Sequence, residues 1–437
     1  MQPSSQNMAP AAYFIPPELV ETIIAFVSYR PTLKACSLAG PAFTLPAQRG
    51  LFAEVFLSPP KSRSQKRSPA NRFLNLITSS PHLASFVHSL VIECEDSVQG
   101  QPWLYSDNDL QHVFPRLSKL TKISVNGRIQ PDDEGMSGKA NLSWTSLSAS
   151  LRTALISLIR SGSVVDLELG GFSRIPVSSV VDSCSRLKKL SLLPLYLVDD
   201  TPLPDAESSE NPSENRVHLE DIKIKQSAVA LRRTADWLLS PTCHLDVGEL
   251  KRLHFEVSTL DDHRQISKIV NTCSKSLEHL EVNPGSEVNS VRHLLRSVPV
   301  ERNGSPALSL ETLQALKSLK VNTKINMFKM NNNRFSDPLP WIVSLLSTIP
   351  EENDLTELDL SFALQLTQPT FERVAWQDLV SALSSKKFND LQRVTLAFPP
   401  STKDSVSQER LFWVQDTLNR DSHLSPLITH GLLHVDI

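Results

Sequence analysis

The chain contains the hexapeptide Leu187-Lys188-Lys189-Leu190-Ser191-Leu192, in which apolar residues occupy the first, fourth and sixth positions. The second half of this unit alternates between apolar and polar residues, which predicts a short strand with one buried face. The same spacing recurs ten more times, and the fourth positions of the eleven copies are residues 90, 123, 167, 190, 222, 253, 280, 319, 358, 394 and 435. These positions span 345 residues in ten intervals, so one unit averages 34.5 residues.

Stretches with helical periodicity separate the copies, for example residues 151–159 and 376–383. One strand and one helix per unit is typical of a leucine-rich-repeat solenoid, although the intervals of 23 to 44 residues are irregular and long for that class. A lone unit cannot bury its apolar face, so neighbouring units must stack. We therefore predict an α/β fold in which residues 71–437 form about eleven strand–helix units, the last of them an edge strand at 432–437.

The start of the chain carries a different pattern. It begins with Phe14-Ile15-Pro16-Pro17-Glu18-Leu19, where Pro17 is suited to the first position of a helix. Leu19, Ile23 and Phe26 follow at helical spacing, residues 33–38 read Leu-Lys-Ala-Cys-Ser-Leu, and Phe43 and residues 51–56 supply a third apolar element.

In this order and spacing, residues 14–57 resemble the F-box, a short helical module that docks on the Skp-type adaptor of cullin–RING ubiquitin ligases. Fungal F-box proteins with a repeat domain behind the box look most similar. The resemblance implies an adaptor-binding set of Pro16, Pro17, Leu19, Ile23, Phe26, Leu33, Leu38 and Phe43. A second interpretation is an ordinary helical hairpin that packs on its own domain.

Composition restricts the classes of partner and compartment. The 437 residues carry a net charge of −3, which gives no bulk attraction to nucleic acid or membrane. The five cysteines form no C-x-x-C pair, which indicates reduced thiols and an intracellular protein, cytoplasmic or nuclear. Cys184 and Cys273 occupy equivalent places in the similar segments 181–192 and 270–282, where a helix gives way to a strand. We expect no signal peptide and no membrane span.

Several segments interrupt the periodic pattern. Residues 1–13 are predicted to be disordered, and the basic, serine-rich residues 58–70 read as a flexible linker or, alternatively, as a nuclear import patch. Residues 127–141 and 322–338 are polar, turn-rich insertions. The acidic residues of 199–217 predict a disordered insertion.

No catalytic signature occurs. The chain lacks a phosphate-binding loop, a zinc-binding H-E-x-x-H helix and a nucleophile elbow, and its twelve histidines are scattered. His254, His279 and His434 fall on the exposed side of predicted strands. We therefore expect a protein that is not an enzyme and that holds neither a metal nor a cofactor.

Outward positions on three successive predicted strands carry basic residues, and we predict a target-binding set of Lys189, Lys223, Lys225, Arg252 and His254. Acidic neighbours accompany them: Asp166, Glu168, Asp221, Glu256 and Glu281. One interpretation is a mutually paired, solvated charge surface. The other is a seat for an acidic or phosphorylated segment, which the insertion at 199–217 could occupy until a target displaces it.

Taken with the resemblance, these features imply a substrate-recognition subunit of a Skp–cullin–F-box ubiquitin ligase, with an unknown target protein on the repeats. Two alternatives stay open. One is a repeat-based GTPase-activating protein, and the other is a scaffold that binds the adaptor without a degradation target.

Overall fold

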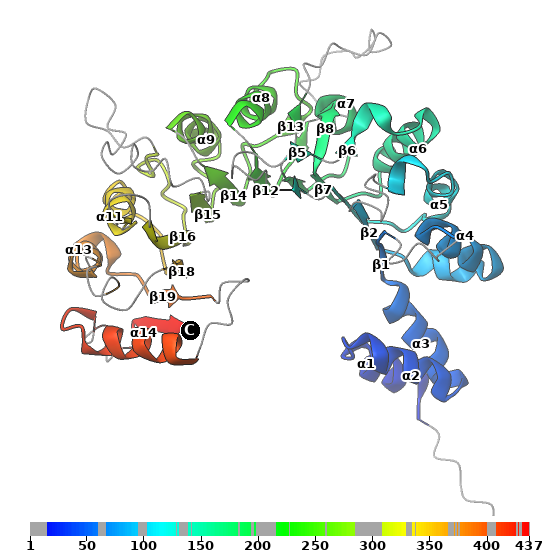
Figure 1. The fold of residues 1–437 in the computed structure, drawn as a ribbon, viewed down its shortest axis with the longest axis horizontal. Helices are drawn as coiled ribbons and strands as arrows, with labels where there is room; N and C mark the ends of the chain where they lie inside the picture. The colour runs from blue at the N-terminus through cyan, green and yellow to red at the C-terminus, as the bar shows by residue number, and fades with distance from the viewer. Residues whose placement is uncertain are drawn as a thin grey trace, which may run out of the picture.

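The structure is a computed structural model that gives one connected chain of strand–helix units behind three N-terminal helices (Figure 1). It describes residues 15–59, 67–94, 103–127, 129–130, 139–140, 142–181, 184–193, 196–197, 216–226, 228–257, 260–284, 308–328, 334–336, 338–365, 371, 374, 376–399, 408–424, 427 and 431–436.

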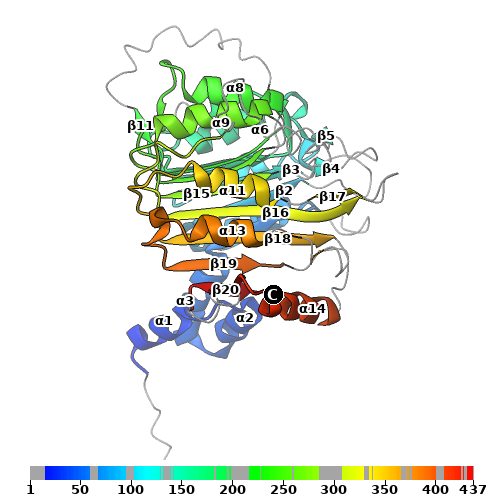
Figure 2. The same cartoon turned by 90° about the vertical axis from the view of Figure 1, so that its left-hand side faces the viewer.

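A long parallel sheet runs the length of the solenoid, and each of its strands pairs with the strand of the next unit (Figure 2). In spatial order the strands are β1 (Glu54–Leu57), β2 (Ser89–Cys94), β3 (Lys122–Gly127), β7 (Asp166–Gly170), β9 (Lys189–Leu192), β12 (Asp221–Lys225), β14 (Arg252–Val257), β15 (His279–Pro284), β16 (Ser318–Phe328), β18 (Glu357–Gln365), β19 (Arg393–Ala397) and β20 (Leu433–Asp436). All eleven predicted strands are confirmed, in chain order. The predicted leucine-rich-repeat solenoid is therefore the observed fold.

Helices cover the outer side of the arc, and the strands line its inner, concave side (Figure 1). They are α4 (Pro69–Ser79), α5 (Leu110–Val113), α6 (Ala149–Arg160), α7 (Val177–Val181), α8 (Ala228–Leu238), α9 (Leu260–Thr272), α11 (Leu339–Ser347), α13 (Trp376–Leu383) and α14 (Gln408–Arg420), with short 3-10 turns at Pro81–Phe86, Trp103–Tyr105, Phe114–Arg116, Trp144–Ser146 and Lys386–Phe388. Minor strands are β4 (Ile129–Gln130), β5 (Lys139–Ala140), β6 (Leu142–Ser143), β8 (Phe172–Ile175), β10 (Tyr196–Leu197), β11 (Val217–His218), β13 (Leu245–Asp246) and β17 (Arg334–Ser336).

The repeat hexapeptide explains this layering. In β9 the apolar residues Leu190 and Leu192 are buried between sheet and helices, whereas Lys189 and Ser191 face the concave side. Just before each strand, two successive N–H groups share one carbonyl of the preceding unit. Those of Lys188 and Lys189 donate to Val165 O at 2.9 and 3.0 Å. The same contact recurs in later units, so it fixes a common register along the solenoid.

The buried thiols of Cys184 and Cys273 lie where the sequence predicted them, between the end of a helix and the start of the next strand. Cys273 Sγ donates to Ile269 O at 3.3 Å, and Cys184 Sγ lies 3.7 Å from Ile159 O. Burial raises the pKa of the Cys273 thiol to about 12, so this thiol stays protonated at neutral pH. None of the five cysteines, all of which lie in the described part of the chain, forms a disulfide bond.

Four predicted boundaries need correction. Residues 54–57 are not part of the helical module but form β1, because they continue the sheet beside β2. The linker ends before residue 69, since Ser68 caps α4 through a 2.9 Å bond from the Asn71 N–H. Residues 322–328 continue β16, which pairs with β18 and turns back through β17. The insertion predicted at 199–217 ends before Val217, whose N–H donates to His244 O at 2.8 Å.

Other predicted segments lie outside the described residues. These are residues 1–13, most of the linker at 60–66, the greater part of the turn-rich insertion at 131–138, and residues 198–215 of the acidic insertion.

His263 in α9 gives the solenoid a dependence on pH. Its side chain is only 3 % exposed and packs against Trp341, with ring centroids 6.2 Å apart. Burial lowers the pKa of this histidine to about 4, so the folded chain holds it neutral. Its contribution to stability is therefore complete above pH ~6.5 and is lost as pH falls toward 4.

We expect wild-type protein to lose about 2 kcal/mol of unfolding free energy between pH 7 and pH 5 through this one group. A His263→Phe variant keeps an aromatic ring there but does not titrate, so its stability should fall less over the same range. Urea unfolding of both proteins at the two pH values measures the difference. Equal losses in the two proteins would contradict this role for His263.

Candidate functional site

The N-terminal helices form a small unit with a core of its own. They are α1 (Pro17–Ala25), α2 (Arg30–Ala39) and α3 (Pro41–Phe52), and each begins with proline at its first or second position. The core contains the buried side chains of Val20, Ile24, Leu33 and Ala47, separate from the core of the solenoid. Four buried residues are few for three helices, so the unit depends on contacts beyond itself.

Contacts with the first turns of the solenoid anchor this unit. The Arg30 guanidinium donates to Leu51 O at 3.0 Å and to Glu54 O at 3.2 Å, where α3 passes into β1. The guanidinium of Arg49 on α3 lies 5.8 Å from the ring centroid of Phe86. Helices α2 and α3 therefore contact the repeat domain, and the unit presents a second face to solvent.

That second face is apolar. Eight of the eleven exposed large hydrophobic side chains in the described part of the chain fall between residues 15 and 56. Phe26 is 85 % exposed and Leu38 is 79 % exposed. We define the N-terminal apolar surface as Ile15, Leu19, Ile23, Phe26, Tyr29 and Leu38. Clusters of exposed apolar side chains on a soluble domain mark interaction sites.

The structure sorts the predicted adaptor-binding residues into two groups. Pro16, Pro17, Leu19, Ile23, Phe26 and Leu38 are exposed. Leu33 is only 4 % exposed, so its assignment to the binding surface is wrong; it fills the small core, where Gly50 approaches it closely. Phe43 is half-buried against that same core. Sequence reasoning missed Ile15 and Tyr29, which lie at the ends of α1 and α2 and outside the helical periodicity.

Two truncations should separate folding from docking on α2. Leu33→Ala opens a cavity in the small core and should destabilise the N-terminal unit by about 2–4 kcal/mol. Leu38→Ala removes an exposed side chain and should change stability by less than about 0.5 kcal/mol. Hydrogen exchange of α1–α3 measures both effects. Equal protection in the two variants would show that Leu33 does not support the unit.

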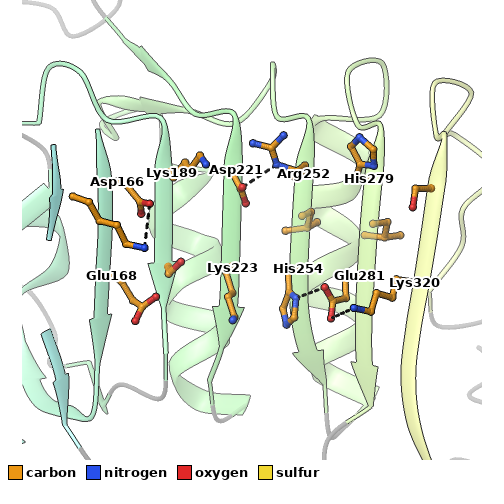
Figure 3. A pocket seen from close by; sticks show the side chains of 15 residues that line it. Asp166, Glu168, Lys189, Asp221, Lys223, Arg252, His254, His279, Glu281 and Lys320 are labelled. Carbon is orange, nitrogen blue, oxygen red and sulfur yellow. Dashed lines mark hydrogen bonds and ion pairs between the residues drawn. The ribbon is translucent and has the colours of Figure 1, made fainter. Parts of the chain in front are cut away.

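The second candidate site lies on the concave face of the sheet, over the middle strands (Figure 3). There a hollow of about 420 Å³ is lined by side chains of β3, β7, β9, β12, β14, β15 and β16. We call it the charged hollow; its lining includes Lys122, Asp166, Glu168, Lys189, Ser191, Asp221, Lys223, Arg252, His254, His279, Glu281, Ser318 and Lys320.

Strand register arranges these residues in two rows across the sheet. In the first row, directly opposed residues alternate in charge: Lys122, Asp166, Lys189, Asp221 and Arg252. The second row runs from Ser124 through Glu168, Ser191, Lys223, His254 and Glu281 to Lys320. Opposite charges on adjacent strands stabilise a sheet, because paired side chains lie within about 5 Å.

Most charges in the hollow are paired. Arg252 Nε contacts Asp221 Oδ2 at 2.9 Å, and His254 Nδ1 contacts Glu281 Oε2 at 2.8 Å. Just outside the hollow, Lys225 contacts Glu256 at 2.9 Å. Three of the five predicted target-binding residues therefore face carboxylates, as the paired-surface interpretation predicted. Lys189 and Lys223 form no ion pair within the described residues.

The carboxylates differ in their electrostatics. Burial raises the pKa of Asp166, with Glu168 and Asp221 adding to the shift while Lys122 and Lys189 oppose it. Burial would also raise the pKa of Glu281, but the hydrogen bond and charge of His254, together with Lys320 and Asn322, bring it below its ordinary value. Glu281 is therefore held as an anion by its neighbours.

Besides Ser191 on β9, the sequence prediction missed four members of the hollow: Lys122, His279, Ser318 and Lys320. They occupy the same repeat positions as the predicted basic residues but on strands to either side, so extending the repeat alignment would have found them.

No group of histidine, cysteine and acidic side chains suited to a metal ion occurs among the described residues. None of the described helices has the length and hydropathy needed to traverse a lipid bilayer.

Comparison with known proteins adds little to what the fold and the two candidate sites show. No protein-family model matches the chain, and no curated protein matches it. Among solved structures, an internalin from Listeria monocytogenes aligns with 86 % of this chain and 98 % of its own, at 12 % identity and a TM-score of 0.30. The assignment to the leucine-rich-repeat class therefore rests on the observed order of strands and helices.

Proposed function

We propose that the chain is a substrate-recruiting subunit of a Skp–cullin–F-box ubiquitin ligase. In this proposal the N-terminal helices dock on the Skp-type adaptor and the concave face of the repeats holds a target protein. Ubiquitin transfer would be carried out by other subunits, so the chain itself would supply binding surfaces and no catalytic group.

The observation that carries the proposal is the N-terminal apolar surface. Leu19 and Ile23 on α1 and Phe26 at its C-terminal end are exposed, while Val20 and Ile24 on another side of the helix fill the core. A helix that is apolar on both sides has one face for its own domain and one for a partner. The exposed residues begin at the Pro-Pro-Glu-Leu sequence that resembles the F-box, which favours the adaptor as that partner.

The concave face supports the second half of the proposal. A curved parallel sheet with varied polar side chains is the surface that repeat proteins use to bind other proteins. The two surfaces lie on different parts of the chain, the helical unit and the middle strands (Figure 1). One partner could therefore occupy each surface at the same time.

Affinity purification of the full chain from its native cells, followed by mass spectrometry, tests the proposal. We expect a Skp-type adaptor and a cullin among the specific partners, together with proteins that accumulate when the proteasome is inhibited. Recovery of a small GTPase without adaptor or cullin would instead support the GTPase-activating alternative. Recovery of adaptor and cullin with no protein stabilised would support the scaffold alternative.

A further inference from the structure

The charged hollow has an unequal balance of paired and unpaired groups. Each of its four carboxylates has a partner: Asp221 pairs with Arg252, Glu281 contacts His254 Nδ1 and lies 3.8 Å from Lys320 Nζ, and Asp166 lies 3.8 Å from Lys122 Nζ. The fourth, Glu168, accepts hydrogen bonds from Ser124 at 2.8 Å and from Asn126 at 2.6 Å. Each carboxylate of the hollow therefore has a partner, and those of Glu168 are uncharged.

Positive charge is not fully compensated. The hollow contains five lysine and arginine side chains, and two of them, Lys189 and Lys223, make no hydrogen bond or ion pair with any described residue. Arg252 uses Nε for Asp221, and its terminal nitrogens form no bond within the same residues. The hydrogen-bond donors of the hollow that have no partner therefore belong to positively charged side chains.

We propose that the charged hollow binds an anionic segment of a target protein, one that carries at least two negative charges as aspartate, glutamate or phosphorylated side chains. The inference rests on the proposed function, because it names the chemistry of the target that the concave face would recruit. Carboxylates and phosphates are the groups that unpaired ammonium and guanidinium donors hold through charge-assisted hydrogen bonds.

The placement of the two free lysines explains why one negative charge is not enough. Lys189 is in the first row of β9 and Lys223 is in the second row of the neighbouring β12. Strand spacing and rise place their Cα atoms about 8 Å apart on the diagonal. Figure 3 shows the Lys189 side chain toward one end of the strands and the Lys223 side chain toward the other. A segment that contacts both lysines must present anionic groups at separate positions.

The paired residues around these lysines add selectivity. Arg252–Asp221 and His254–Glu281 flank Lys223, so acidic groups lie beside every free cation. A basic segment would be repelled by Lys189 and Lys223. A uniformly anionic segment would also meet Asp221 and Glu281, whose like charge repels it, so the hollow favours anionic groups placed only over the two lysines. The hollow therefore differs from a plain basic patch that would bind any polyanion.

Fluorescence anisotropy with labelled peptides at low ionic strength tests the inference on the full chain. The probes are a peptide rich in aspartate and glutamate, a phosphoserine peptide with the same spacing, and a glutamine and asparagine peptide of equal length. We expect both anionic probes to bind and the neutral probe not to bind. Tighter binding of the phosphoserine probe would identify phosphorylated segments as the source, and equal binding would identify acidic ones.

The decisive variant is Lys189→Gln with Lys223→Gln, which should weaken anionic binding by about tenfold because two charge contacts are lost. The matched control, Lys251→Gln with Lys275→Gln, removes the same charge from exposed lysines outside the hollow and should bind as wild type. Absence of anionic binding, or equal weakening in both variants, overturns the inference. Adaptor recovery from all these proteins should be unchanged, so its loss would indicate failure of the proposed function instead.

Discussion

Replacing Leu19 and Ile23 together by aspartate is expected to abolish recovery of the Skp-type adaptor. The two side chains are 54 % and 55 % exposed in the free chain and would be covered by the partner. Burial of each contributes roughly 1.5–3 kcal/mol to docking, and an unpaired carboxylate in the same place adds a desolvation penalty. Adaptor affinity should therefore fall by a factor of about a hundred or more.

The fold should survive this double change, because neither residue belongs to the core of Val20, Ile24, Leu33 and Ala47. Lys34→Asp on α2 is the matched control, since it alters net charge by the same amount at an exposed polar position. Pull-down with purified adaptor and circular dichroism of each protein give the two readouts. Undiminished adaptor recovery from the double variant, with its helices intact, would remove the main support for the proposed function.

Removal of residues 430–437 is expected to destabilise the neighbouring unit of the solenoid. This deletion takes away β20 and Leu432 just before it. The Leu432 carbonyl accepts from the Val394 N–H at 2.9 Å, and the Asp436 carbonyl accepts from the Phe398 N–H at 2.8 Å. Leu433 is 3 % exposed and packs with the solenoid core. The deletion should cost about 3–5 kcal/mol locally, through lost burial and newly exposed apolar surface on β19.

Such a loss should appear as a lower melting temperature and as aggregation, because β19 would become an open edge strand with Val394 and Leu396 less covered. Two point variants on β20 sharpen the test. Leu433→Ala should reproduce part of the effect, whereas His434→Ala, at an exposed position of the same strand, should behave as wild type. A deletion protein with the melting temperature and solubility of the full chain would show that β20 contributes nothing to the end of the solenoid.

The charge chemistry of the concave face shows a limit of sequence reasoning. Four of the five predicted residues, all except Lys225, do lie together in the hollow, because they occupy two adjacent rows on neighbouring strands. Register alone did not decide which of them form ion pairs: Arg252 contacts the opposed Asp221, whereas Lys189 is opposed to both Asp166 and Asp221 and contacts neither. Arg252 Nε and His254 Nδ1 contact carboxylates and so are not available to bind a partner, whereas the ammonium groups of Lys189 and Lys223 are available.

Local pattern alone determined the strands of the solenoid. Alternation of apolar and polar residues, as in Leu190-Ser191-Leu192, indicates which side of a strand is buried, whichever strands lie beside it. All eleven strands could therefore be predicted from the sequence. Tertiary structure decided what depends on distant partners. Leu33 and Leu38 look equivalent in sequence, but α1 and α3 cover only the face that carries Leu33. Residues 54–57 and 322–328 became strands because β2 and β18 offered them hydrogen-bonding partners that no local signal reveals.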